Sequence, residues 1–144
     1  MRRLAGVAAR GVEEGLAQLI TGARGELAER ALEAALALRP GRARVHLGLA
    51  NCARLRQDFD RAERELRTAL ALEPGSPTAL YNLSFTLAQR AERAGTQAEK
   101  RALYGDALSL LDTLLGQLAA SDPRRAPFAE SRANLARQLQ AAGG

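Results

Sequence analysis

The segment Ala28–Gly41, AERALEAALALRPG, is nearly repeated at Ala62–Gly75, AERELRTALALEPG. The two segments agree at 10 of 14 positions, all at the constant offset that separates Ala28 from Ala62. A fixed period of this length is typical of proteins that stack one small structural unit on the next, so that each unit covers the apolar face of its neighbour. The repeat therefore predicts a stacked architecture.

The composition predicts a single helical domain. Of the 144 residues, 47% are hydrophobic but only 3% are aromatic, and most of the apolar content is alanine and leucine, which favours helix. A chain of this length builds one core, so we expect residues 1–144 to form one domain. The net charge of +5 permits contact with acidic partners without requiring it.

Helical periodicity and turn residues predict a series of helical hairpins. The first unit, about residues 11–41, is expected to have a glycine-weakened first helix, a turn at Thr21–Gly25 and a second helix from Glu26 to Leu38. The second unit, about residues 42–75, is expected to pair Ala43–Leu55 with Asp60–Leu72. Ser76 followed by Pro77 is typical of a helix start, with serine as N-cap, and opens the third unit. No stretch alternates with the period of a strand.

The second unit resembles a tetratricopeptide repeat. In that family the first helix carries a large residue, then leucine followed by a small residue, then another apolar residue, and the second carries an aromatic, spaced alanines and a closing proline. Those places are filled here, in order, by His46, Leu49, Ala50, Ala53, Phe59, Ala62, Leu66, Ala69 and Pro74. The resemblance implies an all-α fold: a right-handed superhelical stack of about three such hairpins plus a C-terminal capping helix.

The third unit, about residues 76–121, departs from the regular period. Its second helix aligns with that of the preceding unit only when Tyr104 is matched to Phe59, which is a larger separation than the repeat period. The difference places an 11-residue insertion near residues 90–103. Thr96 and Glu99 have the spacing of a capping box. We expect both helices to lengthen at their shared tip, so that a finger projects from the stack. A last helix, about residues 126–142, is expected to cap the array with the apolar face Phe128, Leu135, Leu139 and Ala142.

Catalytic chemistry has no visible basis in the sequence. The single histidine and single cysteine, His46 and Cys52, do not make a metal site or a nucleophile pair, so we expect no enzyme activity, no metal and no cofactor. His46 is expected to pack between helices, and Cys52 to be a small, at least half-buried residue. Glutamates such as Glu29, Glu33, Glu63 and Glu65 are interpreted as solvated partners of surface arginines.

The same features bear on location. A single cysteine cannot form an internal disulfide, which favours a cytoplasmic protein. The apolar run Leu4–Ala9 is too short for a signal-peptide core or a membrane span.

The resemblance also implies a binding groove, because first helices line the concave face of the family's stack and bind extended or helical peptides there. The positions carried over are Arg44, Leu47, Gly48, Asn51 and Arg54 in the second unit and Thr78, Tyr81, Asn82, Phe85 and Gln89 in the third. Tyr81 and Phe85 share a helix face, and aromatic residues dominate binding energy at many interfaces. Alternatively, the C-terminal helix covers both of them, with Phe128 as their partner.

Asn51 and Asn82 suggest a more specific hypothesis. In the carboxylate-clamp members of the family, two asparagines on successive first helices hold the C-terminal carboxylate of a chaperone, and they are spaced as Asn51 and Asn82 are here. A clamp also needs cations, however, and Leu47 stands where its lysine is expected. Arg124 and Arg125 lie near the expected second basic position but out of register.

Three hypotheses of function remain open. The first is a protein-interaction module whose groove binds a peptide or protein segment, and the second is self-association through an exposed end or the finger. The third is nucleic-acid binding through Arg2, Arg3, Arg42, Arg44, Arg54, Arg56, Arg124 and Arg125. Glutamates are interspersed among these arginines and no stacking aromatics accompany them, which disfavours the third.

Overall fold

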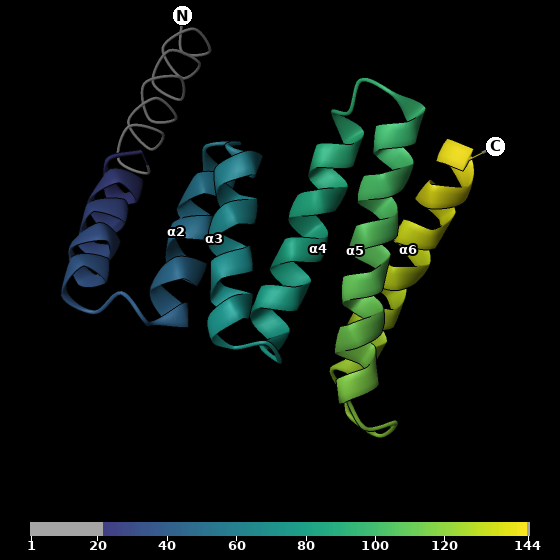
Figure 1. Ribbon diagram of the computed structural model, residues 1–144. Helices are drawn as coiled ribbons and strands as arrows, with labels where there is room; N and C mark the ends of the chain where they lie inside the picture. The colour runs from purple at the N-terminus through teal and green to yellow at the C-terminus, as the bar shows by residue number, and fades with distance from the viewer. Residues whose placement is uncertain (1–21, 144) are drawn as a thin grey trace, which may run out of the picture.

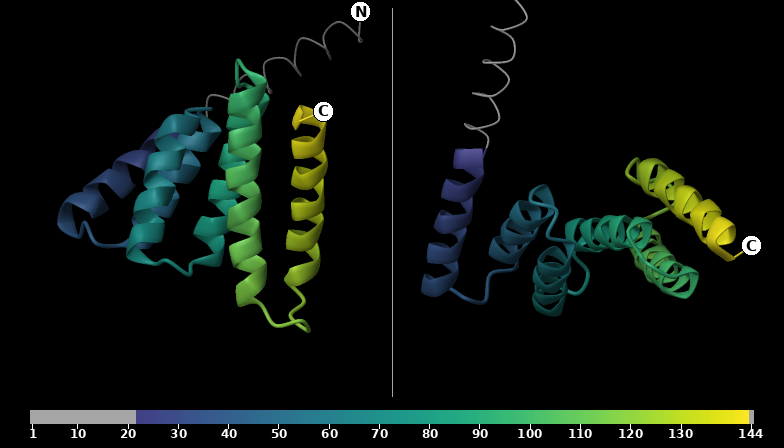
Figure 2. Two further views of the ribbon diagram at one scale, coloured as in Figure 1. Left: turned by 45° about the vertical axis from the view of Figure 1, so that its right-hand side comes forward. Right: turned by 90° about the horizontal axis from the view of Figure 1, so that it is seen from above.

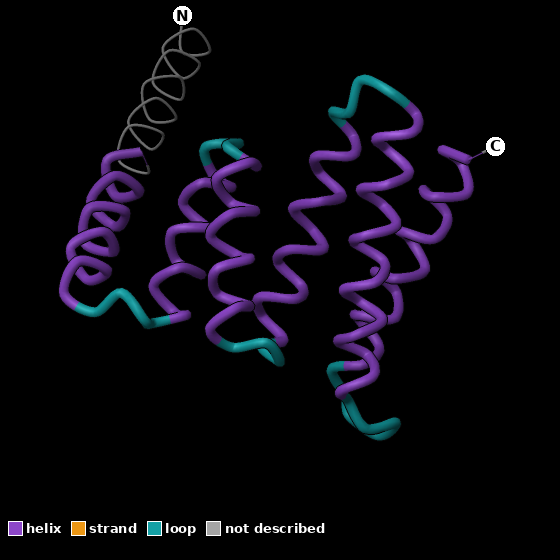
Figure 3. The backbone as a smooth tube through the Cα atoms, in the orientation of Figure 1, coloured by secondary structure: helices purple, strands orange, loops and turns teal. Residues whose placement is uncertain are grey.

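The structure, a computed structural model, describes residues 22–143, and over this range the chain is helix and loop with no strand (Figure 3). A helix over residues 22–38 is followed by α2 (Ala43–Leu55), α3 (Phe59–Leu72), α4 (Pro77–Glu92), α5 (Gln97–Gln117) and α6 (Arg125–Gly143). From α2 to α6 each helix packs on the next along the chain, so the helices form a stack in sequence order (Figure 1). The all-α fold class is confirmed. None of the described helices combines the length and hydropathy that a membrane crossing requires.

Side-chain caps begin three of the helices. The Asp58 side chain accepts a hydrogen bond from the Arg61 amide at 3.1 Å and so starts α3. Ser76 accepts from the Ala79 amide at 3.3 Å, with Pro77 in the first turn of α4, as the sequence predicts. Thr96 accepts from the Glu99 amide at 3.1 Å at the start of α5. Each cap satisfies an amide that the first turn leaves without a helical partner.

The prediction of a turn at Thr21–Gly25 is wrong for residues 22–25, because these residues are helical. A turn built on glycine uses a positive φ, and no glycine in the described range has one. Gly22 and Gly25 lower helix stability by about 1 kcal/mol each relative to alanine, but helix-forming residues follow them directly. The predicted first helix and Thr21 lie outside the described residues.

The 11-residue insertion is divided unequally between the two helices of its hairpin. α4 has 16 residues where α2 has 13, and α5 has 21 where α3 has 14. The loop between α4 and α5 therefore reaches beyond the loop between α2 and α3, as Figure 1 shows. One side of the finger is covered, because α6 packs along α5 (Figure 2). The end of α6 reaches the first turns of α5, where Gly143 lies close to the Arg101 side chain.

The core combines leucines with alanines that are completely buried. Leu66 of α3, Leu83 of α4 and Leu111 of α5 are buried members of one apolar cluster, which extends to Leu135 of α6. The side chains expected on the inner face of α6, namely Phe128, Leu135, Leu139 and Ala142, all belong to this cluster or pack against it. The predicted inner face of the last helix is thus confirmed.

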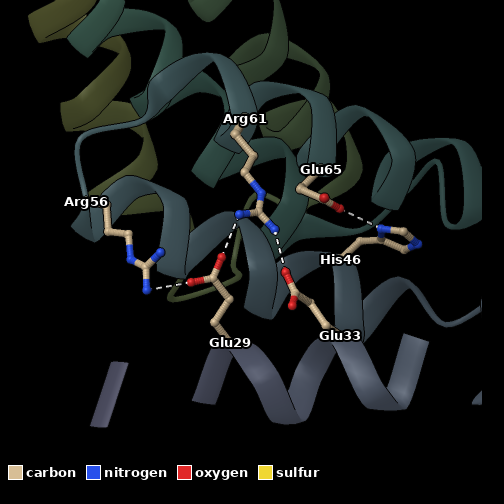
Figure 4. Close-up of polar contacts among 6 residues, drawn as sticks. All are labelled: Glu29, Glu33, His46, Arg56, Arg61 and Glu65. Carbon is tan, nitrogen blue, oxygen red and sulfur yellow. Dashed lines mark hydrogen bonds and ion pairs between the residues drawn. The ribbon is translucent and has the colours of Figure 1, made fainter. Parts of the chain in front are cut away.

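The N-terminal helix is joined to α2 and α3 by ion pairs (Figure 4). Glu29 accepts from Arg56 at 2.7 Å and from Arg61 at 2.5 Å, and Arg61 also contacts Glu33 at 3.1 Å. Glu29 is only 7% exposed, so its interpretation as a solvated surface residue is wrong. It is held between helices, where low solvent exposure strengthens its interaction with the two arginines.

His46 lies at the same junction and has a structural role. Its Nδ1 lies 2.7 Å from a Glu65 carboxylate oxygen (Figure 4). Its Nε2 lies 3.3 Å from the Pro40 carbonyl oxygen. The ring is buried, as expected, and connects the turn after the N-terminal helix to α3. Cys52 is half-buried, which also agrees with the expectation.

The junction of α2 and α3 depends on Gln57. The Asp58 amide donates to the Ala53 carbonyl and the Gln57 amide to the Arg54 carbonyl, both at 2.9 Å, which is the Schellman pattern of a helix C-terminus. This pattern needs a left-handed residue, and Gln57 has a φ of 62°. Its side chain accepts from Arg93 at 2.8 Å, so it also connects the junction to the finger.

Replacing Gln57 by glycine tests whether this backbone conformation limits stability. Left-handed backbone disfavours residues with a Cβ by about 1 kcal/mol or more, which glycine avoids. Gln57→Ala and Gln57→Gly both remove the contact with Arg93, so they differ mainly in backbone strain. We expect the glycine variant to exceed the alanine variant by about 1 kcal/mol in unfolding free energy, measured by denaturant titration. An alanine variant of equal or greater stability would contradict this account.

Candidate binding groove

The predicted positions on α2 form one side of the candidate groove. Arg44 is exposed, and Leu47 is half-buried against the core. Asn51 is exposed, and its side-chain oxygen accepts a hydrogen bond from Arg54 at 2.7 Å. Gly48 is closely approached by Leu32 of the N-terminal helix, since a Cβ at Gly48 would lie 2.8 Å from a Leu32 methyl carbon. Gly48 therefore serves the packing of the N-terminal helix.

The predicted positions on α4 differ in their exposure. Thr78 is exposed, Asn82 and Gln89 are half-buried, and Phe85 is 40% exposed. The Arg54 guanidinium lies 5.5 Å from the centre of the Phe85 ring, within the range of a cation–π contact. The structure therefore brings Asn51, Arg54 and Phe85 together across α2 and α4.

Tyr81 and Phe85 share a face of α4 but lie in different environments. Tyr81 packs against Phe128 of α6, with ring centres 5.3 Å apart and planes inclined by 48°. Phe85 lies one turn further on, and its only described aromatic or cation–π contact is with Arg54. Of the two alternatives, coverage by the C-terminal helix therefore holds for Tyr81, while Phe85 remains accessible to solvent.

A cavity of about 280 Å³ lies between α4 and α6. Three of the predicted residues line it, Tyr81, Phe85 and Gln89. Sequence reasoning missed the part of the wall that α6 supplies, which consists of Ser131, Asn134, Leu135 and Gln138. The periodicity of α6 identified its apolar face, but only the packing of α6 on α4 and α5 brings the neighbouring polar residues to the cavity.

The cations that a carboxylate clamp would need are engaged elsewhere. Arg124 forms an ion pair with Asp122 at 2.8 Å, and its hydrogen bonds lower the pKa of the Asp122 carboxyl to about 2. Arg125 donates to the carbonyls of Leu115 and Leu118 at 2.7 and 2.9 Å. Both arginines therefore fasten the turn between α5 and α6, and Leu47 supplies no charge.

The described residues of the candidate groove include groups that can bind a partner, but no set of metal ligands. Within residues 22–143 no group of three or more histidine, cysteine, aspartate and glutamate side chains could hold a metal ion. Tyr104, in the core beneath the finger, has its pKa raised by burial and, to a smaller extent, by the charge of Glu92. Its hydroxyl thus stays protonated at neutral pH. What the groove presents is an exposed aromatic ring, amide groups and a small number of charges.

The different environments of Tyr81 and Phe85 predict different effects of truncation. Tyr81→Ala removes a half-buried ring and its contact with Phe128, and we expect the unfolding free energy to fall by about 2 kcal/mol. Phe85→Ala removes a more exposed ring and its contact with Arg54, so the expected loss is below about 1 kcal/mol. Denaturant titration of both variants measures the difference. Equal losses would show that α6 protects both rings to the same degree.

Comparison with known proteins agrees with this fold. The sequence profile of the tetratricopeptide repeat family matches residues 23–83, whereas no curated protein sequence matches the chain. Among solved structures, the type III secretion translocator chaperone SycD of Yersinia enterocolitica is similar, with 20% identity, a TM-score of 0.54 and coverage of 88% of this chain and 77% of that one.

Two further structures show the same similarity. SycD in complex with a peptide of the translocator YopD has 20% identity and a TM-score of 0.54, covering 88% of this chain and 85% of that one. PcrH from Pseudomonas aeruginosa has 16% identity and a TM-score of 0.52, again covering 88% and 85%. At these identities the likeness concerns the fold. The match to the tetratricopeptide repeat family covers residues 23–83, the stretch that contains both copies of the repeated segment.

Proposed function

We propose that the protein is a non-enzymatic interaction scaffold that binds a peptide or protein segment in the groove formed by α2, α4 and α6. The observation that carries the proposal is Phe85, an aromatic ring 40% exposed beside a cavity of about 280 Å³. Exposed aromatics next to a concave site are typical anchors for a partner. SycD, which has the same fold, has been solved with a peptide of YopD, and this supports a peptide as the ligand class here.

The predicted groove residues take distinct roles in this proposal. Phe85 and Tyr81 provide apolar contact area, and Leu47 extends it on α2. Asn51, Asn82 and Gln89 provide amide groups that can bond a peptide backbone. Arg44, Arg54 and Thr78 border the groove and contact the partner at its edge. A cytoplasmic location suits this function, because the single Cys52 forms no internal disulfide.

Nucleic-acid binding is less well supported by the surface. Of the arginines that suggested it, Arg56 pairs with Glu29, Arg124 with Asp122, and Arg54 contacts Asn51. Arg2 and Arg3 lie outside the described residues. An arginine already held by a carboxylate neutralises a phosphate less effectively, because the existing ion pair must first be broken.

The groove is tested with the double variant Asn82→Ala/Phe85→Ala. Native chain immobilised on beads is expected to capture partner proteins from the source lysate, identified by mass spectrometry. The variant should capture these partner proteins at least roughly tenfold less, because an interface anchor is lost. Thr68→Ala/Leu72→Ala is a matched control, since it removes one polar and one exposed apolar side chain from α3. Unchanged capture by the groove variant, at unchanged helicity and melting temperature, would rule out the groove.

Self-association is a second candidate, favoured by exposed leucines at the N-terminal side of the stack. Leu27 and Leu38 of the N-terminal helix are 65% and 83% exposed, and Leu55 of α2 is 71% exposed. Exposed apolar side chains gathered on one part of a surface favour contact with a second copy. SycD has been solved as an alternative dimer, which supports the same behaviour for this fold.

Light scattering across a concentration series tests this second candidate. We expect the native chain to dimerise, and Leu27→Glu/Leu38→Glu to remain monomeric because a charge at each position opposes apolar contact. Arg24→Glu/Arg30→Glu is the control, since both residues are exposed on the same helix without adding to its apolar surface. A native chain that stays monomeric at the highest concentration would exclude self-association.

A further inference from the structure

The cavity between α4 and α6 has both apolar and polar lining residues. Its apolar lining consists of Tyr81, Phe85, Ala88, Leu111 and Leu135. The polar residues are Ser84, Gln89 and Glu92 of α4 and Ser131, Asn134 and Gln138 of α6. The volume of about 280 Å³ accommodates one long side chain of a bound segment. The hydrogen-bonding state of the polar residues decides which side chain fits.

The two serine hydroxyl groups of the lining are already satisfied within their own helices. Ser84 donates to the Tyr81 carbonyl at 2.7 Å, and Ser131 donates to the Pro127 carbonyl at 3.0 Å. The Asn134 side-chain oxygen accepts from Arg137. These residues therefore contribute little to a ligand beyond shape.

Two acceptors of the lining have no described partner. The Gln89 side-chain oxygen is buried and has no hydrogen-bond partner within residues 22–143. Glu92 is exposed, lies one turn further along α4, and takes part in none of the ion pairs among the described residues. Leaving a buried acceptor without a donor is unfavourable, so a ligand that brings a donor gains at this position. In the described part of the chain no lysine or arginine lines the cavity, and Glu92 is its one charged lining residue.

We propose that this cavity binds a lysine or arginine side chain of the partner segment. The aliphatic stem packs along Phe85, Ala88 and Leu135, and the cationic head donates to the Gln89 oxygen and the Glu92 carboxylate. Long basic side chains bury their methylene groups on apolar surface while the charged end stays near water, which matches a cavity lined by apolar side chains and by one exposed carboxylate, Glu92.

Other side chains fit the lining less well. A carboxylate would lie beside Glu92 with no cation among the described residues of the cavity wall, and like charges at short range repel. A purely aliphatic side chain would fill the apolar part but leave the Gln89 oxygen without a donor. This inference rests on the proposed function, because it names the residue type that the groove selects in its partner.

Selection of a random peptide library on the full 144-residue chain tests the inference even while the partner is unidentified. Phage displaying random dodecamers are selected on the native chain, and the enriched sequences are aligned. We expect lysine or arginine to be enriched at one fixed position. Calorimetry then compares a selected peptide with its norleucine analogue, which keeps the aliphatic stem and removes the charge. The analogue should bind the native chain about tenfold more weakly.

The role of Glu92 is measured with charge-matched variants. On Glu92→Gln we expect the preference for lysine over norleucine to shrink to about threefold or less, because the charge-assisted contact becomes a neutral one. Glu130→Gln makes the same charge change at an exposed position of α6 that does not line the cavity, and should leave the preference unchanged. Gln89→Leu should weaken binding of the lysine peptide and leave binding of the norleucine analogue unchanged.

The outcomes separate this inference from the proposed function. Enrichment of peptides with no fixed basic position would overturn the inference and leave the groove as a binding site. The same holds if the norleucine analogue binds the native chain as tightly as the lysine peptide. If no peptide is enriched on the native chain, the proposed function fails and this inference fails with it.

Discussion

Completely buried alanines bring the helices of this structure together, and the arrangement of the whole stack depends on them. Ala62 and Ala69 of α3, Ala79 of α4 and Ala107 of α5 have no exposed surface. A methyl group lets two helix backbones approach, and leucines such as Leu66 then fill the space on either side. Ala69 and Ala79 share a cluster with Ala43, so α2, α3 and α4 meet at this point. The position of α4, and with it that of its predicted groove residues, follows from that contact.

A second contact recurs with the period of the sequence. Glu29 pairs with Arg56, and Glu63 pairs with Arg90, so both members of the pair are displaced by the same offset that separates the two copies of the repeated segment. In each case a glutamate on one helix meets an arginine at the C-terminal end of the helix that follows. The repeat therefore preserves a polar contact between units as well as the apolar core. It also shows that the helix over residues 22–38 occupies, relative to α2, the place that α3 occupies relative to α4.

Local signals predicted much of this fold, and features that depend on distant residues escaped prediction. The bounds of α2, the Ser76 cap and the apolar face of α6 follow from residues close in sequence, which is why they could be read directly. The helical state of Gly22 and Gly25 could not be predicted, because glycine also occurs within helices. The left-handed conformation of Gln57 could not be predicted either, because glutamine rarely adopts it. The candidate site divides in the same way. Tyr81 and Phe85 are equivalent on a helical wheel, and only the packing of Phe128 distinguishes them.

The proposed groove carries a basic residue on α2 and an acidic residue on α4. Arg54 is positioned on the α2 side by Asn51 and lies against Phe85, so the basic charge is fixed next to the aromatic ring. Glu92 and the buried, unpartnered Gln89 oxygen line the cavity shared with α6, as Phe85 does. A segment that crossed the groove in the opposite sense would place its charges against like charges, which costs more than the loss of an attractive contact because both groups are also partly desolvated. Under the proposed function, the guanidinium of Arg54 and the carboxylate of Glu92, both near the Phe85 ring, favour one orientation of the bound segment.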